Sequence, residues 1–403
     1  MNLSEQRKPQ RLSIRVKPAA ERMVKKGHPW VFADSISKQN STGEAGDIVV
    51  IYDNNKNKFL ACGLYDPHSP IRVKLLQFHQ PAMIDEQFFA TRIQEAFARR
   101  KPLLDTDTNS YRFIYGENDG LPSLIADVYD SVLVLKIYSA IWLPYLNEIL
   151  PALVQHSRCK AIVLRLSRSL MQLEEKGDLS DGQVLWGTLD NEEVLFKECG
   201  LLFAANVIAG HKTGYFLDQR HNRQKIGAAA KGKKMLDVFA YAGGFSVHAL
   251  AGGATEVTSI DVSAKALQMA QKNAALNAHQ GIHHTKAVDA FVELEAMAQR
   301  REAFDIVVID PPSFAKQASE VERARRHYLR LAKLGAQVLS PGGLLFLASC
   351  SSRVSADNFF ALCAEGIGAS KQTLELKEKT FHDLDHPITF AEGAYLKAGY
   401  WSR

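Results

Sequence analysis

Acidic residues stand at the ends of three successive stretches that are expected to form strands in the second half of the chain. Asp237 lies near the end of the first, Asp261 closes the second and Asp289 closes the third. Any one of these acids could simply cap a helix. However, the first stretch leads into a turn at Gly243 and an apolar helix expected over 245–250. Glycine lets a ligand approach the backbone and a helix start offers free N–H groups, so this combination predicts a site for a nucleotide-sized ligand.

The spacing of these residues distinguishes between two cofactors. A carboxylate after the second strand can hold both ribose hydroxyls, and one after the third can accept from an adenine amino group, which indicates an adenosine derivative. A nicotinamide dinucleotide is the rival, but the turn lacks G-x-G-x-x-G and Asp237 would repel a diphosphate. S-adenosylmethionine, with its cationic sulfur and its ammonium group, fits better. The expected cofactor-binding residues are Asp237, Phe239, Tyr241, Gly243, Asp261, Asp289 and Asp310.

Two further strands are expected to end in reactive groups. The fourth closes in Asp310 followed by Pro-Pro-Ser-Phe, a stiff loop beside the methyl donor that can hold a flat base. The fifth closes in a Ser-Cys-Ser sequence that contains Cys350. A buried cysteine is usually only a small apolar residue, but this setting at the sheet edge favours a nucleophile.

A thiol at this position has a specific chemical use. Carbon 5 of a pyrimidine is a poor nucleophile until a thiolate adds to carbon 6, which makes carbon 5 reactive toward a methyl group. Asp310 is placed to donate a proton or a hydrogen bond at ring N3 as negative charge builds there. Methylation of an exocyclic amine or a ring nitrogen needs no cysteine, so Cys350 favours carbon-5 chemistry.

The elements that must position these residues alternate between strand and helix from residue 191 to residue 403. Strands are expected over 235–239, 256–261, 284–289, 304–310 and 344–349, with helices between them and two late strands at the end. This alternation predicts an α/β domain with a doubly wound, mostly parallel sheet, in which ligands bind at the carboxyl ends of the strands.

Two smaller modules are expected before this domain. Residues 1–82 read as a strand-rich module with a hairpin over 46–65. Its Gly-His-Pro-Trp-Val-Phe sequence at 27–32 and its strand at 69–73 resemble a PUA domain, a small β-barrel that binds structured RNA. Residues 83–190 read as a central α+β domain without a catalytic constellation, which serves as a spacer or as an RNA-contacting platform.

Composition narrows the class of protein. A chain of 403 residues with 46% apolar residues fits two or three globular domains. It has no long apolar run, so we expect no membrane partner and a cytoplasmic location. The five cysteines lack CxxC spacing, which indicates neither a metal site nor a disulfide framework. The net charge of +5 permits a polyanionic partner without requiring one.

Four motifs together resemble one known family. The sequences at 211–220 (His-Lys-Thr-Gly-Tyr-Phe-Leu-Asp-Gln-Arg), 237–245, 310–314 and 349–351 are similar to those of bacterial 23S ribosomal RNA cytosine-5 methyltransferases. The resemblance implies a PUA domain joined to a Rossmann-like class I methyltransferase domain, with S-adenosylmethionine as cofactor and large-subunit ribosomal RNA as partner. It also implies Cys350 as the nucleophile. Many RNA cytosine-5 enzymes carry a cysteine after the motif proline, where this chain has Ser313.

The end of the chain adds one more candidate. The sequence Asp385-His386-Pro387 followed by Ala391-Glu392-Gly393 resembles the family's ending. Related uracil-5 methyltransferases carry a proton-accepting glutamate in a comparable late loop. Glu392 is therefore the expected base for carbon 5, although a glutamate in such a turn is often only solvated.

Two other functions stay open from the residues alone. One is a ribosomal RNA guanine N-methyltransferase in which Cys350 has no role. The other is a non-catalytic RNA-binding assembly factor, which should have lost cofactor residues that this chain keeps. The oligomeric state also stays open, with a homodimer as one alternative.

Overall fold

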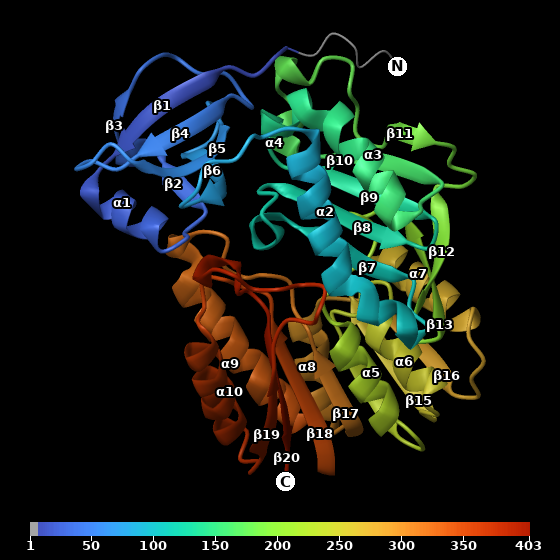
Figure 1. Cartoon of the computed structure of the whole chain (residues 1–403). Coiled ribbons are helices and arrows are strands. Elements are labelled where there is room, and N and C mark those ends of the chain that lie inside the picture. Colours follow the sequence, from blue (N-terminus) through green and yellow to red (C-terminus); the bar gives the residue numbers. More distant parts are fainter. Residues whose placement is uncertain (1–6) are drawn as a thin grey trace. The chain divides into compact units, whose positions relative to one another are not determined.

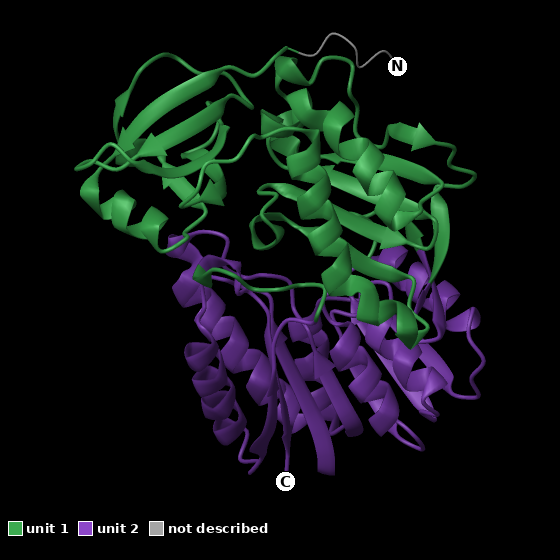
Figure 2. Ribbon diagram, viewed as in Figure 1, with its two compact units in different colours: residues 1–196, 205–215, 384–391 green, residues 197–204, 216–383, 392–403 purple. Residues whose placement is uncertain are grey.

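The computed structural model describes residues 7–403, drawn in Figure 1, so the first six residues of the expected module 1–82 lie outside it. The chain divides into two compact units, shown in Figure 2. Unit 1 comprises residues 1–196, 205–215 and 384–391, and unit 2 comprises residues 197–204, 216–383 and 392–403. The expected N-terminal module and central domain thus share one unit, and a segment near the C-terminus joins them.

The first part of unit 1 is a six-stranded sheet in the order β2-β6-β5-β4-β1-β3. Its apolar side chains alternate along β1 and β4, and they form a core with Val24 of the first helix. The elements are β1 (Arg11–Val16), α1 (Pro18–Lys25), β2 (Trp30–Phe32), β3 (Ile36–Gln39), β4 (Ile48–Tyr52), β5 (Phe59–Tyr65) and β6 (Ile71–Phe78).

The second part of unit 1 is a five-stranded sheet in the order β11-β10-β9-β8-β7, with its own apolar core. The elements are α2 (Glu86–Arg100), β7 (Ser110–Tyr115), β8 (Leu124–Tyr129), β9 (Val132–Ile137), α3 (Leu146–Ser157), β10 (Ala161–Leu166), α4 (Arg168–Met171) and β11 (Val184–Gly187). The edge strand β11 has only four residues and little burial.

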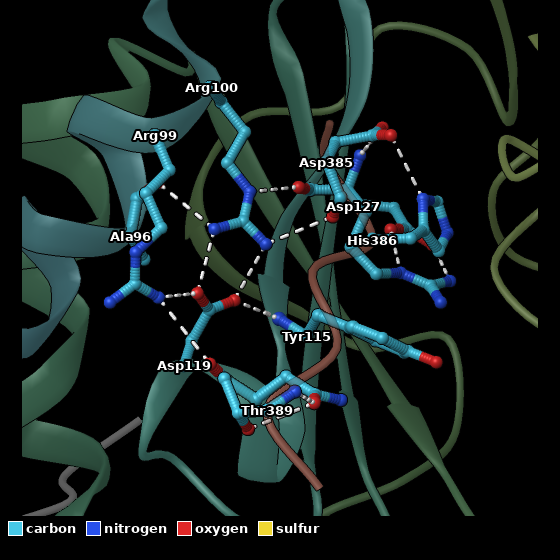
Figure 3. A network of polar contacts seen from close by, with 11 residues as sticks. Ala96, Arg99, Arg100, Tyr115, Asp119, Asp127, Asp385, His386 and Thr389 are labelled. Carbon is cyan, nitrogen blue, oxygen red and sulfur yellow. Dashed lines mark hydrogen bonds and ion pairs between the residues drawn. The ribbon is translucent and has the colours of Figure 1, made fainter. Parts of the chain in front are cut away.

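A buried ion pair holds the C-terminal segment 384–391 in unit 1 (Figure 3). Arg100 is fully buried and donates to both oxygens of Asp119 at 2.7 Å. The same guanidinium donates to the backbone carbonyl of Asp385 at 2.9 Å, and the carboxylate of Asp385 accepts from the backbone N–H of Arg112. The chain therefore leaves unit 2 after β19 (Glu375–Thr380), is fixed in unit 1, and returns for its last strand.

Unit 2 is built on a seven-stranded sheet in the order β16-β15-β14-β17-β18-β20-β19. The strands from β16 to β18 are parallel, whereas β20 is antiparallel to both of its neighbours, β18 and β19. The remaining strands are β14 (Lys234–Val238), β15 (Glu256–Asp261), β16 (Ile282–Ala287), β17 (Phe304–Ile309), β18 (Leu339–Ser349) and β20 (Lys397–Ser402). The strand order reverses at β14, so the cleft between the ends of β14 and β17 is where such sheets bind ligands.

Helices cover both faces of this sheet, which confirms the expected doubly wound α/β fold. Helices α5, α6 and α7 contact one another in series, and so do α8, α9 and α10. The helices are α5 (Arg220–Ala229), α6 (Gly244–Ala251), α7 (Ala264–Ala275), α8 (Ala290–Arg300), α9 (Val321–Gln337) and α10 (Ala356–Ala369). A short pair of strands, β12 (Glu193–Glu198) and β13 (Leu201–Asn206), precedes α5.

The buried ion pair of Figure 3 yields a prediction about stability. Replacing Asp119 by alanine leaves the Arg100 guanidinium charged and buried, so the free energy of unfolding should fall by about 3–5 kcal/mol. Denaturant unfolding followed by circular dichroism measures this change. The matched control is Glu95→Ala on α2, the helix that carries Arg100. Glu95 makes only an exposed pair with Arg92, so its loss should change stability by less than about 1 kcal/mol. Equal effects of the two substitutions would contradict the prediction.

Candidate active site

Asp237 ties the end of β14 to the start of α6. Its buried carboxylate accepts hydrogen bonds from the backbone N–H of Ser246 at 3.1 Å and from the Ser246 hydroxyl at 2.6 Å. The Ser246 hydroxyl also contacts Ser259 on β15 at 2.7 Å. Burial raises the pKa of Asp237 to about 6, the Ser246 hydrogen bonds oppose this shift and the nearby Asp261 adds to it. Asp237 therefore lies beneath the loop and fixes its two ends.

The loop itself is strained. Phe239 and Tyr241 adopt left-handed backbone conformations with φ of 66° and 48°, which are uncommon for bulky non-glycine residues. Gly243 also has a positive φ of 77°, and a Cβ at this position would lie 2.7 Å from the Cβ of Ala270 on α7. Sequence reasoning assigned this glycine to close approach of a ligand. In the structure the glycine is required by the close packing of the loop against α7.

Asp261 holds the other side of the loop. One carboxylate oxygen accepts from the backbone N–H of Tyr241 at 3.0 Å and the other from Ser263 at 2.8 Å. Each carboxylate oxygen has a second lone pair, so the group can still receive the two hydroxyls of a ribose. The next side chain, Val262, is 80% exposed and offers an apolar surface beside that carboxylate. Sequence reasoning overlooked Val262, although its position after the acid was a usable signal.

Asp289 caps a helix, which was the alternative to cofactor binding that the sequence allowed for it. Its exposed carboxylate caps α8 by accepting from the backbone N–H groups of Phe291 at 2.9 Å and Val292 at 3.0 Å. Contact with an adenine amino group therefore remains a prediction for this residue.

Asp218 and Gln219 directly precede α5. Both belong to the motif at 211–220, but the sequence alone indicated no role for either side chain. The carboxylate of Asp218 accepts a hydrogen bond from the Tyr395 hydroxyl at 2.7 Å. Gln219 is 1% exposed, and its amide lies beside the carboxyl of Asp310 and favours the ionised form of that group. Asp218 and Gln219 therefore place a negative charge and a hydrogen-bond donor near Asp310.

Asp310 is a carboxyl group with a strongly perturbed acidity. It follows β17 directly, and its backbone N–H points to the carbonyl of Val238 on β14, across the point where the strand order reverses. Burial raises the pKa of Asp310 to about 7, and the negative charge of Asp218 adds to the shift, while the Gln219 amide opposes it. Near neutral pH the group is therefore present in both its protonated and its ionised form.

Cys350 lies against Asp310 at the end of β18. Its Sγ is 3.8 Å from Oδ1 of Asp310, within the range of a hydrogen bond to sulfur. The flanking serines fix this position, because Ser349 donates to the Tyr328 hydroxyl at 2.8 Å and Ser351 donates to the carbonyl of Ala315 at 3.3 Å. The Asp-Pro-Pro loop and the Ser-Cys-Ser motif are thus linked, as the sequence argument expected for neighbouring strand ends.

Lys397 supports the turn after Cys350. Its ammonium is 3% exposed and donates to the backbone carbonyls of Ser351, Val354 and Tyr395. Three acceptors match the three donors of an ammonium group. Burial lowers the pKa of Lys397 to about 8, and a thiolate at Cys350 would raise it again. Lys397 thus holds the turn and brings positive charge toward Cys350, which sequence reasoning did not anticipate.

The expected carbon-5 base, Glu392, lies near the C-terminus of the chain. It is exposed and lies in a short 3₁₀ turn (Ala391–Gly393) between the segment fixed in unit 1 and β20. Its role as the carbon-5 base remains a prediction.

The residues at this edge fit S-adenosylmethionine. Asp261 can receive ribose hydroxyls, and Val262 can cover an adenine ring. Within residues 7–403 no group of three or more His, Cys, Asp or Glu side chains is arranged to hold a metal ion. In the same range no helix is both long enough and apolar enough to cross a membrane.

Comparison with solved structures supports the fold. A candidate SAM-dependent methyltransferase from Streptococcus mutans is 21% identical, with a TM-score of 0.81 over 97% of this chain and 100% of that chain. A second solved methyltransferase, complexed with SAH, is also 21% identical, with a TM-score of 0.82 over 98% of this chain and 100% of the other.

Comparison with known sequences identifies the family. Residues 117–387 match the S-adenosylmethionine-dependent methyltransferase family, and residues 14–78 match a PUA-like domain. A "Ribosomal RNA large subunit methyltransferase" from Deinococcus radiodurans is 42% identical over 96% of both chains. A "Ribosomal RNA large subunit methyltransferase I" from Shewanella denitrificans is 35% identical over 96% of this chain and 98% of the other. The chain therefore belongs to the S-adenosylmethionine-dependent methyltransferases, uses that cofactor, and carries a PUA-like domain in its N-terminal part.

Proposed function

We propose that this protein methylates carbon 5 of a cytosine in large-subunit ribosomal RNA, with Cys350 as the nucleophile. The observation that carries the proposal is the pair formed by the Cys350 thiol and the Asp310 carboxyl, 3.8 Å apart at the cofactor edge of the sheet. Methylation of a guanine nitrogen would leave this pair without a use, because a ring nitrogen or an amine is already nucleophilic. A non-catalytic role is disfavoured because Asp237, Asp261 and Asp310 are all present.

The substrate class rests on the relatives. Two proteins that match nearly the whole chain are named as methyltransferases of large-subunit ribosomal RNA. The PUA-like domain supports an RNA substrate, and a cytoplasmic location would follow from such a substrate in a bacterium.

The acidity of Asp310 supports a defined proton path. The ionised carboxyl takes the proton from the Cys350 thiol, and the resulting thiolate adds to carbon 6 of the cytosine. The protonated Asp310 then gives this proton to ring N3, so that the electron pair displaced from the C5–C6 bond is neutralised. A pKa near 7 suits a group that must both accept and release a proton at neutral pH.

The remaining steps restore the enzyme. Bound S-adenosylmethionine supplies an electrophilic methyl group. Carbon 5 takes this methyl group, a base removes the carbon-5 proton, the C6–S bond breaks and the N3 proton returns to Asp310. We propose Glu392 as that base. Lys397 stabilises the sulfur as it leaves as a thiolate.

The nucleophile is tested by trapping. RNA that contains 5-fluorocytosine cannot release the carbon-5 substituent, so the wild-type protein should remain covalently attached to it. Cys350→Ala should form no adduct and should lose methylation by about 10³-fold or more. Cys363→Ala is the matched control, because this thiol is buried in α10 and should be dispensable. An adduct with Cys350→Ala, or full methylation by it, would exclude the mechanism.

The raised pKa of Asp310 predicts a pH-dependent stability. A carboxyl whose pKa is raised on folding favours the folded state below its unfolded pKa near 4, and this contribution is lost as the pH rises through about 7. Relative to Asp310→Asn, the wild-type protein should therefore lose about 1–3 kcal/mol of unfolding free energy between pH 4 and pH 8. Denaturant unfolding at several pH values measures the difference, in which the contribution of Asp237 cancels. A difference that stays constant with pH would show that Asp310 ionises normally.

The role of Glu392 is tested by loss of the carbon-5 proton. Glu392→Gln should still form the covalent adduct at carbon 6 but should release tritium from carbon-5-labelled RNA at least about tenfold more slowly. Unaltered tritium release would eliminate Glu392 as the base and leave the role of Cys350 untouched.

A further inference from the structure

A chain of hydrogen bonds runs from the cofactor loop of unit 2 toward the edge of its sheet. The carboxylate of Asp237, beneath the loop, contacts the Ser246 hydroxyl on α6 at 2.6 Å. The Ser246 hydroxyl contacts the Ser259 hydroxyl on β15 at 2.7 Å, and Ser259 contacts Nε2 of His283 on β16 at 2.8 Å. Asp237 is 1% exposed and the two serines are fully buried, so protein atoms shield this chain from water.

The pairing of three neighbouring strands explains the alignment of these side chains. Asp237 on β14 is the register partner of Ser259 on β15, and Val257 on β15 is the register partner of His283 on β16. Side chains two residues apart on a strand share a face, so Asp237, Ser259 and His283 all point to the same side of the sheet. Helix α6 packs on β14 and β15 and brings Ser246 to that side.

The number of available protons sets the direction of the chain. An ionised carboxylate can only accept hydrogen bonds, so the Ser246 hydroxyl must donate its single proton to Asp237. The Ser246 oxygen then accepts from the Ser259 hydroxyl, and the Ser259 oxygen accepts from Nε2–H of His283. An ionised Asp237 therefore requires His283 to carry its proton on Nε2.

The imidazole of His283 is suited to the end of this chain. Burial lowers the pKa of His283 to about 4, and the charges of His279 and His284 add to this effect. The ring is therefore neutral at physiological pH, and a neutral imidazole can either donate or accept at Nε2. Its Nδ1 makes no hydrogen bond to any residue of the range 7–403, so no partner there fixes the tautomer.

Protonation of Asp237 reverses the chain. The Asp237 hydroxyl then donates to Ser246, Ser246 donates to Ser259, and Ser259 donates to Nε2 of His283. One proton balances the change, because it enters at Nδ1 of His283, each group passes on the proton that it held, and the last proton reaches Asp237. The tautomer of His283 therefore follows the ionisation of Asp237.

Several charged groups lie around the two ends of the chain. Asp261 raises the pKa of Asp237 and Arg223 on α5 lowers it, while Asp310 and Asp237 repel each other. The remaining titratable groups on the adjoining elements are His248 of α6, which contacts Glu198 at 3.0 Å, the exposed Lys265 and Lys272 of α7, His279, His284 and Glu256 of β15. A substitution of His283 leaves all of these groups in place.

We propose that His283 is a positioning residue of the cofactor site, which acts through Ser259 and Ser246 to keep the Asp237 carboxylate ionised for S-adenosylmethionine. An ionised Asp237 attracts the positive charges of this cofactor without touching them, and it holds the backbone N–H of Ser246 at the start of α6. The inference concerns the cofactor alone, so it holds whichever RNA base receives the methyl group.

The pH dependence of cofactor binding tests this proposal. Isothermal titration calorimetry with S-adenosylhomocysteine gives the affinity at pH 6.5 and pH 8.5. His283→Phe keeps a ring but removes the donor, so less Asp237 should be ionised at pH 6.5 and binding should weaken about threefold. At pH 8.5 Asp237 is ionised in both proteins, and the loss should be less than about 1.5-fold. Comparison at equal pH cancels the titration of the ligand's own amine.

Two further variants separate the lost donor from the altered ring. His283→Gln places an amide N–H within reach of Ser259 and should restore wild-type affinity at both pH values. His284→Phe is the matched control, because it makes the same change on the next residue of β16, whose exposed side chain points to the other side of the sheet. It should bind S-adenosylhomocysteine as the wild-type protein does.

The tautomer of His283 can be measured in the wild-type protein without any cofactor. Nitrogen-15 NMR of labelled histidine rings reports which nitrogen carries the proton, and the signal of His283 is the one missing from the spectrum of His283→Gln. The proton should lie on Nε2 at pH 8.5 and should move to Nδ1 as the pH falls through about 6, while the ring stays neutral. This measurement decides the question if His283→Phe does not fold.

The outcomes distinguish the inference from a structural role and from the proposed function. A structural role alone would weaken binding equally at both pH values, and that result would overturn the inference. Unchanged affinity of His283→Phe at pH 6.5, or a proton on Nδ1 at pH 8.5, would overturn it as well. None of these results bears on Cys350, because neither measurement involves RNA or methyl transfer.

Discussion

The reactive contact between the Cys350 thiol and the Asp310 carboxyl depends on the raised pKa of that carboxyl. Burial and the charge of Asp218 hold the pKa of Asp310 near 7, so a proton can pass between sulfur, carboxyl and base at neutral pH. An ordinary aspartate, with a pKa near 4, would release a proton readily to ring N3 but would accept one from the thiol poorly. The reaction that we propose therefore depends on the surroundings of one side chain.

Much of unit 2 serves to hold this contact in place. The serines on both sides of Cys350 bind α9 and the Asp-Pro-Pro loop, and the Lys397 ammonium binds the turn that follows. On the cofactor side, the strained backbone at Phe239 and Tyr241 is maintained by Asp237, Asp261 and the packing of Gly243 on α7. Buried carboxyls, a buried ammonium and strained residues all lower stability, so the sheet core must supply the compensation.

The architecture of unit 2 could be predicted from the sequence because short stretches with strand character alternate with helical ones, and β14, β15 and β17 are largely apolar. The sequence also predicted that Asp310 and Cys350 lie at one edge of the sheet, because the carboxyl ends of neighbouring parallel strands meet there. It could not reveal the roles of Gln219 and Lys397, because their burial and partners depend on segments far apart in the chain. It also could not reveal the packing of Gly243 against Ala270, which lies on a later helix. The domain boundaries and the role of Glu392 remain predictions.

The central claim is that the methyl group goes to carbon 5 of a cytosine. Mass spectrometry of nucleosides from large-subunit ribosomal RNA, compared between cells with the protein and cells without it, tests this claim most directly. The account predicts that a 5-methylcytidine disappears when the protein is absent and returns when the wild-type protein is supplied, but not when Cys350→Ala is supplied. An unchanged 5-methylcytidine content with the loss of an N-methylguanosine would contradict the account.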